Sequence, residues 1–391
     1  MTTTPARPAL SLADLPVASD REAAWQALLD QGPLVDVDGA VFVVGNKAVD
    51  VVLHDPATYS SRLAFGVVGS PVPMVPIAFD PPEHMRYRKL LAPFFSPVVV
   101  GRMYESLREQ LRALITPLAE AGRCDVVRDL AVPFPSQVFL TLLGLPLSDT
   151  ERLVRWKDAV LAAAGPAGAS EGQQAEALEL FTYLGEKIEQ RRGQPGEDLL
   201  TVLVNDTSAE AMSQEELLGL GFLMVLAGLD TVTATLGFAF ELLARDADLR
   251  GRLAQDLTLV PGFVEELVRL NPVATFTPRV TTQDTVLEGR DLPAGTRVVM
   301  VWAAANRDPD RYEDGTAVQL DRDEAHWGFG GGIHRCLGSH LARAELRLVL
   351  EEWLTQVPDF ALQPGTTPVL PWPAGLLGFP SVELTYGGAR T

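Results

Sequence analysis

Segment 329–338 reads Phe-Gly-Gly-Gly-Ile-His-Arg-Cys-Leu-Gly and is the most informative stretch of the 391-residue chain. Its four glycines leave the backbone free to pass close to a flat or bulky group. Apolar residues at helical spacing follow over residues 337–353, which predicts a helix that begins just after Cys336. Unpaired N–H groups and the helix dipole favour negative charge at such a position. We therefore expect Cys336 to have a lowered pKa and to act as a thiolate, either as a nucleophile or as a metal ligand.

Several kinds of site use a cysteine of this kind. A zinc site would need further Cys or His ligands at short spacing, but the chain has one other cysteine, Cys124, and five histidines. A catalytic pair with His334 is an alternative, although a histidine two positions earlier would not face the thiolate directly. A phosphate-binding glycine loop would be followed by Lys and Ser or Thr, which is not the case here. A single axial bond to haem iron fits one thiolate on a glycine-lined surface.

The middle of the chain is mainly helical by pattern. Apolar residues recur at helical spacing over residues 101–121 and 171–192. Ser-Gln-Glu-Glu at 213–216 is a capping box, which predicts a long, largely buried helix running to about Ala244. In Asp-Pro-Pro-Glu at 80–83, the acid is expected to cap a further helix.

Strand signals are fewer and shorter. They cover residues 34–44 and 286–301 and recur near the C-terminus. No repeat or linker interrupts the pattern, so we expect one domain over residues 1–391, of which residues 1–15 form a flexible N-terminus. The predicted fold class is mainly α with small β-sheets, an α+β arrangement.

The composition is that of an acidic globular protein. Apolar residues make up 47% of the chain, charged residues 21%, and the formal net charge is −19. Such a surface repels phosphate, so we expect neither nucleic acid nor an anionic membrane as a partner. The N-terminus has no signal-peptide core, and the longest apolar run, residues 217–229, is too short to span a bilayer. With two cysteines in all, a cytoplasmic location is expected.

Segment 329–338 resembles the haem-binding loop of the cytochrome P450 monooxygenases, whose Phe, Gly, Gly, His, Cys and Gly it carries at the family's spacing. The resemblance extends over residues 34–384 and implies the P450 fold, with a long central helix over the haem, in a soluble bacterial protein of class I. It implies haem b as the cofactor and Cys336 as the thiolate ligand of its iron, which favours O–O cleavage. It also implies cofactor contacts from Phe329, Gly330, His334 and Gly338.

Ala-Gly-Leu-Asp-Thr at 227–231 lies in the predicted long helix. An acid followed by a hydroxyl is costly inside an apolar helix unless it is used, and Gly228 would let the helix open locally. The plain alternative is a solvated Asp230 and a Thr231 that bonds back to the carbonyl four residues earlier. Beside the cysteine loop, the stretch resembles the family's oxygen-activation motif. That implies Asp230 and Thr231 as proton-handling catalytic residues, with Ala227 and Gly228 next to the haem.

The two haem propionates require cations. The resemblance assigns them His84 and Arg88, which lie one helical turn apart, together with Arg279 and His334. Taken singly, each of these four residues would be an ordinary surface charge.

Glu266 and Arg269 are spaced i, i+3 on one helix face. By pattern alone they form a surface ion pair. The resemblance makes them the family's buried pair, which joins that helix to the meander before the cysteine loop and has a structural role.

Residues 63–79 carry no charge, and a loop this apolar is not expected to face water. Its position before the first haem-contacting helix resembles the family's substrate-covering segment, and a well-packed core loop is the alternative. With parts of the long helix and of residues 273–276, it would enclose a hydrophobic or amphiphilic substrate. The candidate pocket residues are Leu63, Phe65, Val68, Val72, Met74, Val75, Phe222, Val225, Leu226, Val273, Thr275 and Phe276.

Electrons must come from outside, because the sequence shows no Rossmann-type dinucleotide motif and no cysteine cluster for an iron–sulfur centre. Arg86, Lys89, Arg102 and Arg335 are expected on the cysteine side of the haem, where basic residues guide acidic electron carriers. We expect a separate ferredoxin and ferredoxin reductase as partners of a monomeric protein.

Together these inferences favour a haem-thiolate monooxygenase, which inserts one oxygen atom of O2 into a hydrophobic substrate by hydroxylation or oxidative dealkylation. A peroxide-driven variant is the nearest alternative, but Asp230 and Thr231 argue against it, since such relatives dispense with the acid–alcohol pair. A non-catalytic haem-binding sensor is a third interpretation, and the same pair and the apolar segment 63–79 argue against it.

Overall fold

The computed structural model describes residues 10–65, 72–164 and 170–387. Most of these residues lie in helices and the remainder includes three small sheets, so the predicted fold class is confirmed. The helices are α1 (Arg21–Leu29), α2 (Asn46–His54), α3 (Ser61–Phe65), α4 (Glu83–Leu91), α5 (Pro97–Ala121), α6 (Pro133–Leu142), α7 (Thr150–Ala164), α8 (Glu171–Arg191), α9 (Leu199–Val204), α10 (Gln214–Arg245), α11 (Ala247–Gln255), α12 (Val260–Leu270), α13 (Trp302–Ala305) and α14 (Ser339–Gln356). The strands are β1 (Leu34–Val37), β2 (Ala40–Val43), β3 (Tyr59–Ser60), β4 (Arg123–Asp125), β5 (Phe276–Thr281), β6 (Thr285–Leu287), β7 (Arg290–Leu292), β8 (Arg297–Val301), β9 (Ala361–Leu362) and β10 (Glu383–Thr385).

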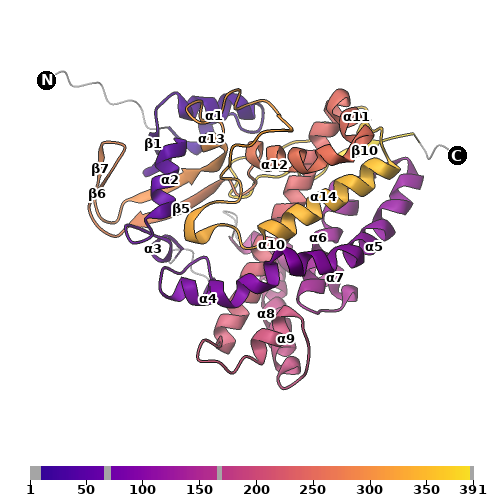
Figure 1. Cartoon of the computed structure of the whole chain (residues 1–391), viewed down its shortest axis with the longest axis horizontal. Coiled ribbons are helices and arrows are strands. Elements are labelled where there is room, and N and C mark those ends of the chain that lie inside the picture. Colours follow the sequence, from indigo (N-terminus) through magenta and orange to yellow (C-terminus); the bar gives the residue numbers. More distant parts are fainter. Residues whose placement is uncertain (1–9, 66–71, 165–169, 388–391) are drawn as a thin grey trace.

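The main sheet has five strands in the order β1-β2-β8-β5-β3 and lies at one side of the molecule, beside α1 and α2 (Figure 1). β1 and β2 form an antiparallel hairpin around Asp38 and Gly39, which both have positive φ. β8 runs parallel to β2 and antiparallel to β5. β5 carries Arg279 at a buried position opposite Val298, so the sheet delivers one cation to the interior.

The central helix α10 confirms the predicted capping box. The Ser213 hydroxyl accepts the N–H of Glu216, and the Glu216 carboxylate accepts the N–H of Ser213. By length and composition α10 is the one helix among the described residues that could cross a membrane, but most of its apolar stretch is buried inside the protein. It packs against α6, α8, α12 and α14. This surrounding contact explains why its sequence is apolar on nearly every face.

The other long helices form close to their predicted bounds. α5 starts four residues before the predicted 101–121, because Ser96 caps it, and it ends at Gly122, which adopts a left-handed φ of 72°. α8 covers nearly all of the predicted 171–192 and begins with a second capping box at Ser170. The two helices and their neighbours fill the part of the molecule away from the main sheet (Figure 1).

The predicted flexible N-terminus is wrong for residues 10–15. Leu10 forms a bridge to Val37, the N–H of Leu12 donates to the Asp38 carboxylate, and Leu15 is buried. These contacts attach the segment to the edge of the main sheet. Residues 1–9 lie outside the described part of the chain.

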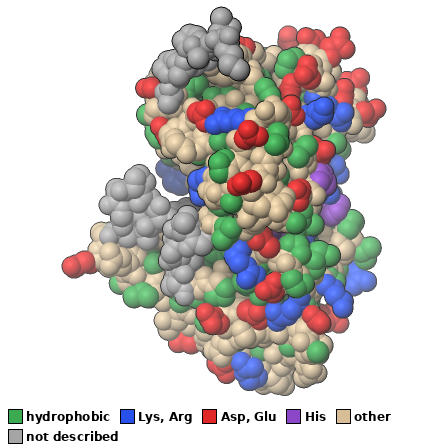
Figure 2. All heavy atoms as spheres, turned by 90° about the vertical axis from the view of Figure 1, so that its left-hand side faces the viewer, with side chains coloured by type: hydrophobic (Ala, Val, Ile, Leu, Met, Phe, Trp, Pro, Cys, Tyr) green, Lys and Arg blue, Asp and Glu red, His purple; other side chains and the backbone are tan. Residues whose placement is uncertain are grey.

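On the face shown in Figure 2, acidic and basic side chains are interspersed, with carboxylates numerous at both ends. This distribution agrees with the strongly negative net charge of the chain.

Candidate active site

A mostly apolar cavity of about 380 Å³ lies between one face of α10 and the loop that carries Cys336. α4, α6, β5 and α14 contribute further parts of its wall, together with segments 75–77 and 271–274 and with Val268 of α12. It unites side chains from stretches that are far apart in the sequence. Every residue that the sequence assigned to cofactor contact lines this cavity: His84, Arg88, Ala227, Gly228, Arg279, Phe329, Gly330, His334, Cys336 and Gly338.

Cys336 lies three residues before α14, and the surface that it exposes is part of the cavity wall. Its N–H donates to the Phe329 carbonyl at 2.8 Å, and the N–H of Gly338 is directed at its sulfur. The predicted lowering of its pKa is wrong for the polypeptide alone. Burial raises the pKa of the Cys336 thiol, and the Gly338 N–H and nearby arginines offset this only in part. A metal ion deprotonates a coordinating thiol outright, so this sulfur suits a thiolate that forms on iron binding.

Two arginines, Arg88 and Arg279, and two histidines, His84 and His334, border the cavity. We call this set the cationic rim after its arginines, because the two histidines are neutral in the polypeptide alone. Both ring nitrogens of His84 are buried without a hydrogen-bond partner among the described residues. Burial lowers the pKa of His84 to about 4 and that of Arg279 to about 10. Burial and the neighbouring arginines lower the pKa of His334 to about 2. Buried donors without acceptors are costly, so this rim fits a group that brings carboxylates, as the haem propionates would.

Ser61 and Asp80 support the cationic rim, a role that no local sequence pattern indicates. The Ser61 hydroxyl lies 3.1 Å from Nε2 of His334, and the Ser61 N–H donates to Asp80 at 2.8 Å. The expectation that Asp80 caps α4 is therefore wrong: its carboxylate binds Ser61 and the Ser60 hydroxyl, and Pro82 precedes α4 without a side-chain cap. The contacts join residues far apart along the chain, which a local pattern does not reveal.

One face of α10 forms the wall opposite Cys336. The predicted wall residues Phe222, Val225 and Leu226 are wrong, because a turn of about 100° per residue places them on other faces of the helix. Phe222 stacks on Phe181 of α8 with ring centroids 5.2 Å apart, and Val225 is fully buried in the core. The lining residues of α10 follow helical spacing: Leu220, Leu223, Met224, Ala227, Gly228, Thr231, Val232 and Thr235.

The other residues predicted to form the pocket lie in different places. Val75 and Val273 line the cavity, whereas Leu63 is half exposed to solvent and Phe276 packs against Phe42. Val68 lies outside the described residues. Within the described part of the chain, four more predicted residues do not line the cavity: Phe65, Val72, Met74 and Thr275. The walls that the sequence analysis missed come chiefly from α6, through Pro135, Val138, Phe139 and Leu142.

Asp230 is buried and bonded to a lysine that the sequence analysis did not single out. Lys157 of α7 places Nζ 2.7 Å from Asp230 Oδ1 and 2.9 Å from Asp158. Burial raises the pKa of Asp230, and the lysine opposes this rise. Burial alone would lower the pKa of Lys157, but its two carboxylate partners raise it overall. Asp230 Oδ2 has no partner among the described residues, so one oxygen of this acid is unoccupied.

Thr231 lines the cavity, and its hydroxyl donates to the carbonyl of Ala227 at 2.8 Å. This is the back-bond that the sequence left open as the plain alternative. α10 is continuous through Gly228, so the expected local opening of the helix is not seen. A Cβ at Gly228 would meet Phe139 at 4.0 Å. Because Gly228 has no side chain, the backbone of α10 borders the cavity directly beside Thr231.

Glu345 is a further lining residue that the sequence analysis missed. It is buried on α14, its Oε2 has no partner in the described structure, and burial raises its pKa well above the usual range. The neutral acid is the stable form in such surroundings. Its position one helical turn after Leu341, on the buried face, was a signal that could have identified it.

Glu266 and Arg269 are both buried and joined by two bonds, of 2.6 and 2.8 Å. Arg269 donates to the carbonyls of Asn306, Gly315 and Ala317. Glu266 also accepts the N–H of Gln319 and is 3.1 Å from Arg322. The pair thus contacts the segment before the cysteine loop, in agreement with its expected structural role.

The four basic residues expected near the cysteine loop differ in availability. Arg86 is bonded to Glu216 at 2.8 and 3.0 Å and to the carbonyl of Glu210, so it clamps α4 to the start of α10. Lys89, Arg102 and Arg335 are exposed, and the described structure gives them no ion pair. The prediction that Arg86 is available to guide an electron carrier is therefore wrong, because its charge is paired with Glu216.

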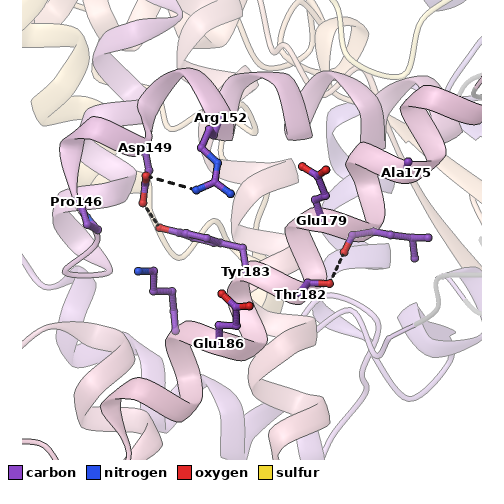
Figure 3. Close-up of a pocket in the computed structure, with 10 residues that line it drawn as sticks. Pro146, Asp149, Arg152, Ala175, Glu179, Thr182, Tyr183 and Glu186 are labelled. Atoms are coloured by element: carbon purple, nitrogen blue, oxygen red, sulfur yellow. Dashed lines mark hydrogen bonds and ion pairs between the residues drawn. The ribbon is translucent and has the colours of Figure 1, made fainter.

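A second hollow, of about 620 Å³, opens between α7 and α8 (Figure 3). The Tyr183 hydroxyl donates to Asp149 at 2.7 Å, and Glu179 accepts the indole N–H of Trp156 at 3.1 Å. No lining side chain described there has a buried polar atom without a partner. This hollow therefore gives no indication of a bound group.

The cytochrome P450 family model matches residues 39–381 of the chain. The chain belongs to the cytochrome P450 family. Cytochrome P450 monooxygenase PikC from Streptomyces venezuelae is 34% identical to this P450, over 92% of this chain and 90% of its own. Mycinamicin IV hydroxylase/epoxidase from Micromonospora griseorubida is 36% identical, over 77% of this chain and 76% of its own. The crystal structure of CalO2 matches with a TM-score of 0.88 and 28% identity, over 97% of this chain and 99% of that one.

As a P450, the protein has the P450 fold and is an oxidoreductase that incorporates oxygen from O2 into an organic substrate. P450s are haem-thiolate proteins, in which a cysteine binds the iron of protoporphyrin IX, and they receive electrons from redox partners. The cavity fits this group on two observations. Cys336 supplies a cysteine sulfur in the wall, and His84 of the cationic rim holds two buried nitrogens without partners among the described residues.

Proposed function

We propose that this P450 inserts one oxygen atom of O2 into a hydrophobic organic substrate, by hydroxylation or by oxidative dealkylation. The observation that carries the proposal is that Cys336 and Thr231 line the same mostly apolar cavity. Haem bound through the Cys336 thiolate supplies the activation of oxygen. The cationic rim of His84, Arg88, Arg279 and His334 binds its propionates. The apolar walls from α6 and α10 exclude water and enclose the substrate.

Thr231 and Asp230 handle protons in this proposal. The Thr231 hydroxyl gives its own proton to Ala227, so its oxygen can accept a hydrogen bond from the cavity side. Asp230 is one residue away, held through Oδ1 by Lys157, and its Oδ2 is free. A carboxyl with one free oxygen can take up a proton on the α7 side and release it toward Thr231.

Electrons come from a ferredoxin and a ferredoxin reductase in this proposal. Lys89, Arg102 and Arg335 are exposed, and the Arg335 carbonyl in the cysteine loop accepts a hydrogen bond from Arg88 at 2.9 Å. Exposed cations on an otherwise acidic protein direct an acidic carrier to one surface. The protein acts as a monomer in the cytoplasm, where its thiols stay reduced.

The test begins with a substrate. Apolar compounds are screened for a low- to high-spin change of the Soret band, and binders are incubated with ferredoxin, reductase and NAD(P)H. Oxygen consumption that depends on the compound, together with a hydroxylated or dealkylated product, supports the proposal. Epoxides are included among the products sought, since one relative is named a hydroxylase/epoxidase. Product formed with peroxide alone would identify a peroxide-driven enzyme, and binding without turnover a sensor.

The proton-handling pair is tested with a matched control on the same helix. Thr231→Ala and Asp230→Asn should retain haem but consume oxygen without equivalent product. Thr233→Ala removes a hydroxyl that donates to Leu229 and Ala131, away from the cavity, and should stay coupled. Full coupled turnover by either of the first two variants would contradict the assigned role.

A further inference from the structure

Three side chains form a compact cluster behind Phe329: Glu265 of α12, Arg343 of α14, and His326. Arg343 binds Glu265 through two bonds, Nε to Oε1 at 2.6 Å and Nη2 to Oε2 at 2.7 Å. Nε2 of His326 lies 3.2 Å from Oε2 of the same carboxylate. Arginine–carboxylate contacts with two parallel bonds fix the guanidinium in both position and orientation.

The cluster holds the start of the cysteine loop against α12. The N–H of Gly328 donates to Nδ1 of His326 at 3.0 Å, so Nδ1 carries no proton and Nε2 is the donor to Glu265. The His326 side chain is 7% exposed. A Cβ at Gly328 would lie 2.4 Å from the carbonyl oxygen of Val268, so the loop passes too close to α12 for any other residue.

Phe329 connects this cluster to the cavity. Cζ of Arg343 lies 4.3 Å from the centroid of the Phe329 ring, within the range of a cation–π interaction. Phe329 lines the cavity, and its carbonyl accepts the N–H of Cys336. The charge of Arg343 also acts on the Cys336 sulfur, where it favours the thiolate. The guanidinium thus influences the cysteine end of the cavity through space and through the placement of Phe329.

We propose that Glu265, Arg343 and His326 are positioning residues that set how readily the haem–thiolate centre accepts an electron. Reduction adds one negative charge to the centre, so a fixed cation nearby favours the reduced state. Glu265 keeps the guanidinium in place and offsets part of its charge, and His326 holds the carboxylate. The inference rests on the proposed ligation of iron by Cys336 and not on any substrate.

The test is a redox titration of the haem-loaded protein and its variants. Arg343→Met should shift the midpoint potential negative, because it removes the cation and leaves Glu265. Glu265→Gln should shift it positive, because it removes the negative charge and keeps an acceptor for the guanidinium. We expect about a tenfold change in the ratio of reduced to oxidised haem at a fixed potential, which is ~59 mV for one electron. Arg343→Lys keeps the charge and should shift the potential less than Arg343→Met.

The control is Arg347→Met, which removes the same charge one turn further along α14. Arg347 is not among the main charged neighbours of the Cys336 sulfur, whereas Arg343 is, so the Arg347→Met shift should be the smallest. A cluster that merely supported the fold would lower haem content in both main variants without shifts of opposite sign. Haem content is therefore measured on the same samples.

Shifts of the same sign in Arg343→Met and Glu265→Gln would overturn the proposal, as would an equally large shift in Arg347→Met. If Arg343→Met does not retain haem, Glu265→Gln decides: a positive shift supports the proposal, and no shift or a negative one overturns it. The reduced carbonyl spectrum of the unmodified protein is recorded first. A spectrum without thiolate ligation would contradict the proposed ligation of iron by Cys336. This measurement therefore distinguishes failure of that proposal from failure of the proposed role of Glu265, Arg343 and His326.

Discussion

The two hollows of this P450 differ in the state of their polar groups. In the hollow between α7 and α8, Tyr183 is paired with Asp149 (Figure 3). In the cavity beside Cys336, His84 and Glu345 have buried polar atoms without partners in the described structure. Because folding leaves few buried polar groups unsatisfied, these two side chains favour the cavity beside Cys336 as the place where a group binds.

The largest effect is expected from Cys336, the one cysteine among the described residues that line the cavity. Cys336→Ser should abolish the thiolate form of the reduced carbonyl spectrum and all oxygenation, because a serine hydroxyl does not supply the charge of a thiolate. Cys124→Ser is the control: burial raises the pKa of Cys124 to about 11, and this thiol does not line the cavity. An unchanged spectrum in Cys336→Ser would remove the basis for distinguishing the two hollows.

The next effect concerns the cationic rim. Arg279→Gln should weaken haem binding by about 2 kcal/mol, roughly thirtyfold, because a charged hydrogen bond to a propionate is lost. The transfer of haem to an acceptor protein measures the dissociation rate. Arg152→Gln, in the other hollow, should leave that rate unchanged. Equal rates for the two variants would mean that the rim does not bind the cofactor.

The unpaired acid gives a stability effect that depends on pH. Burial raises the pKa of Glu345 in the folded protein. Ionisation of Glu345 therefore does not lower the free energy of unfolding below the ordinary carboxyl pKa, but that free energy falls as pH rises from there toward the raised pKa. Glu345→Gln should therefore leave the melting temperature unchanged near pH 4 and raise it increasingly above that pH. Glu352 of the same helix is bonded twice to Arg112, at 2.9 and 3.0 Å. Glu352→Gln should lower the melting temperature at neutral pH, and the same sign in both variants would refute this contrast.

The smallest effect is expected in the hollow between α7 and α8. Tyr183→Phe removes the bond to Asp149 and should lower the free energy of unfolding by about 1 kcal/mol. Haem content and spin state should not change, since this tyrosine contacts α7 and not the cavity. A changed Soret band in Tyr183→Phe would show that the two hollows are coupled.

A comparison of α10 with the cysteine loop shows which features of the site can be predicted from the sequence. Helical spacing alone separates the lining face of α10, with Leu223 and Thr231, from the face with Phe222, yet the sequence does not say which face meets the cavity. The apolar composition of this helix is nearly uniform, so its periodicity carries little information. Lys157 was missed for a similar reason: its contact with Asp230 joins residues 73 positions apart on different helices.

The order of residues by itself determined the family, the cysteine that faces the cofactor, the capped central helix and the cations at the cavity rim. Each of these features depends on a local motif, in which short-range geometry sets the residue types and their spacing. The tertiary structure decided which face of α10 lines the cavity and that burial raises the pKa of Cys336. It also decided that Asp230 is paired with Lys157, whereas Oε2 of Glu345 has no partner among the described residues. These properties depend on what surrounds a side chain, and desolvation and long-range contacts arise only when distant segments pack together.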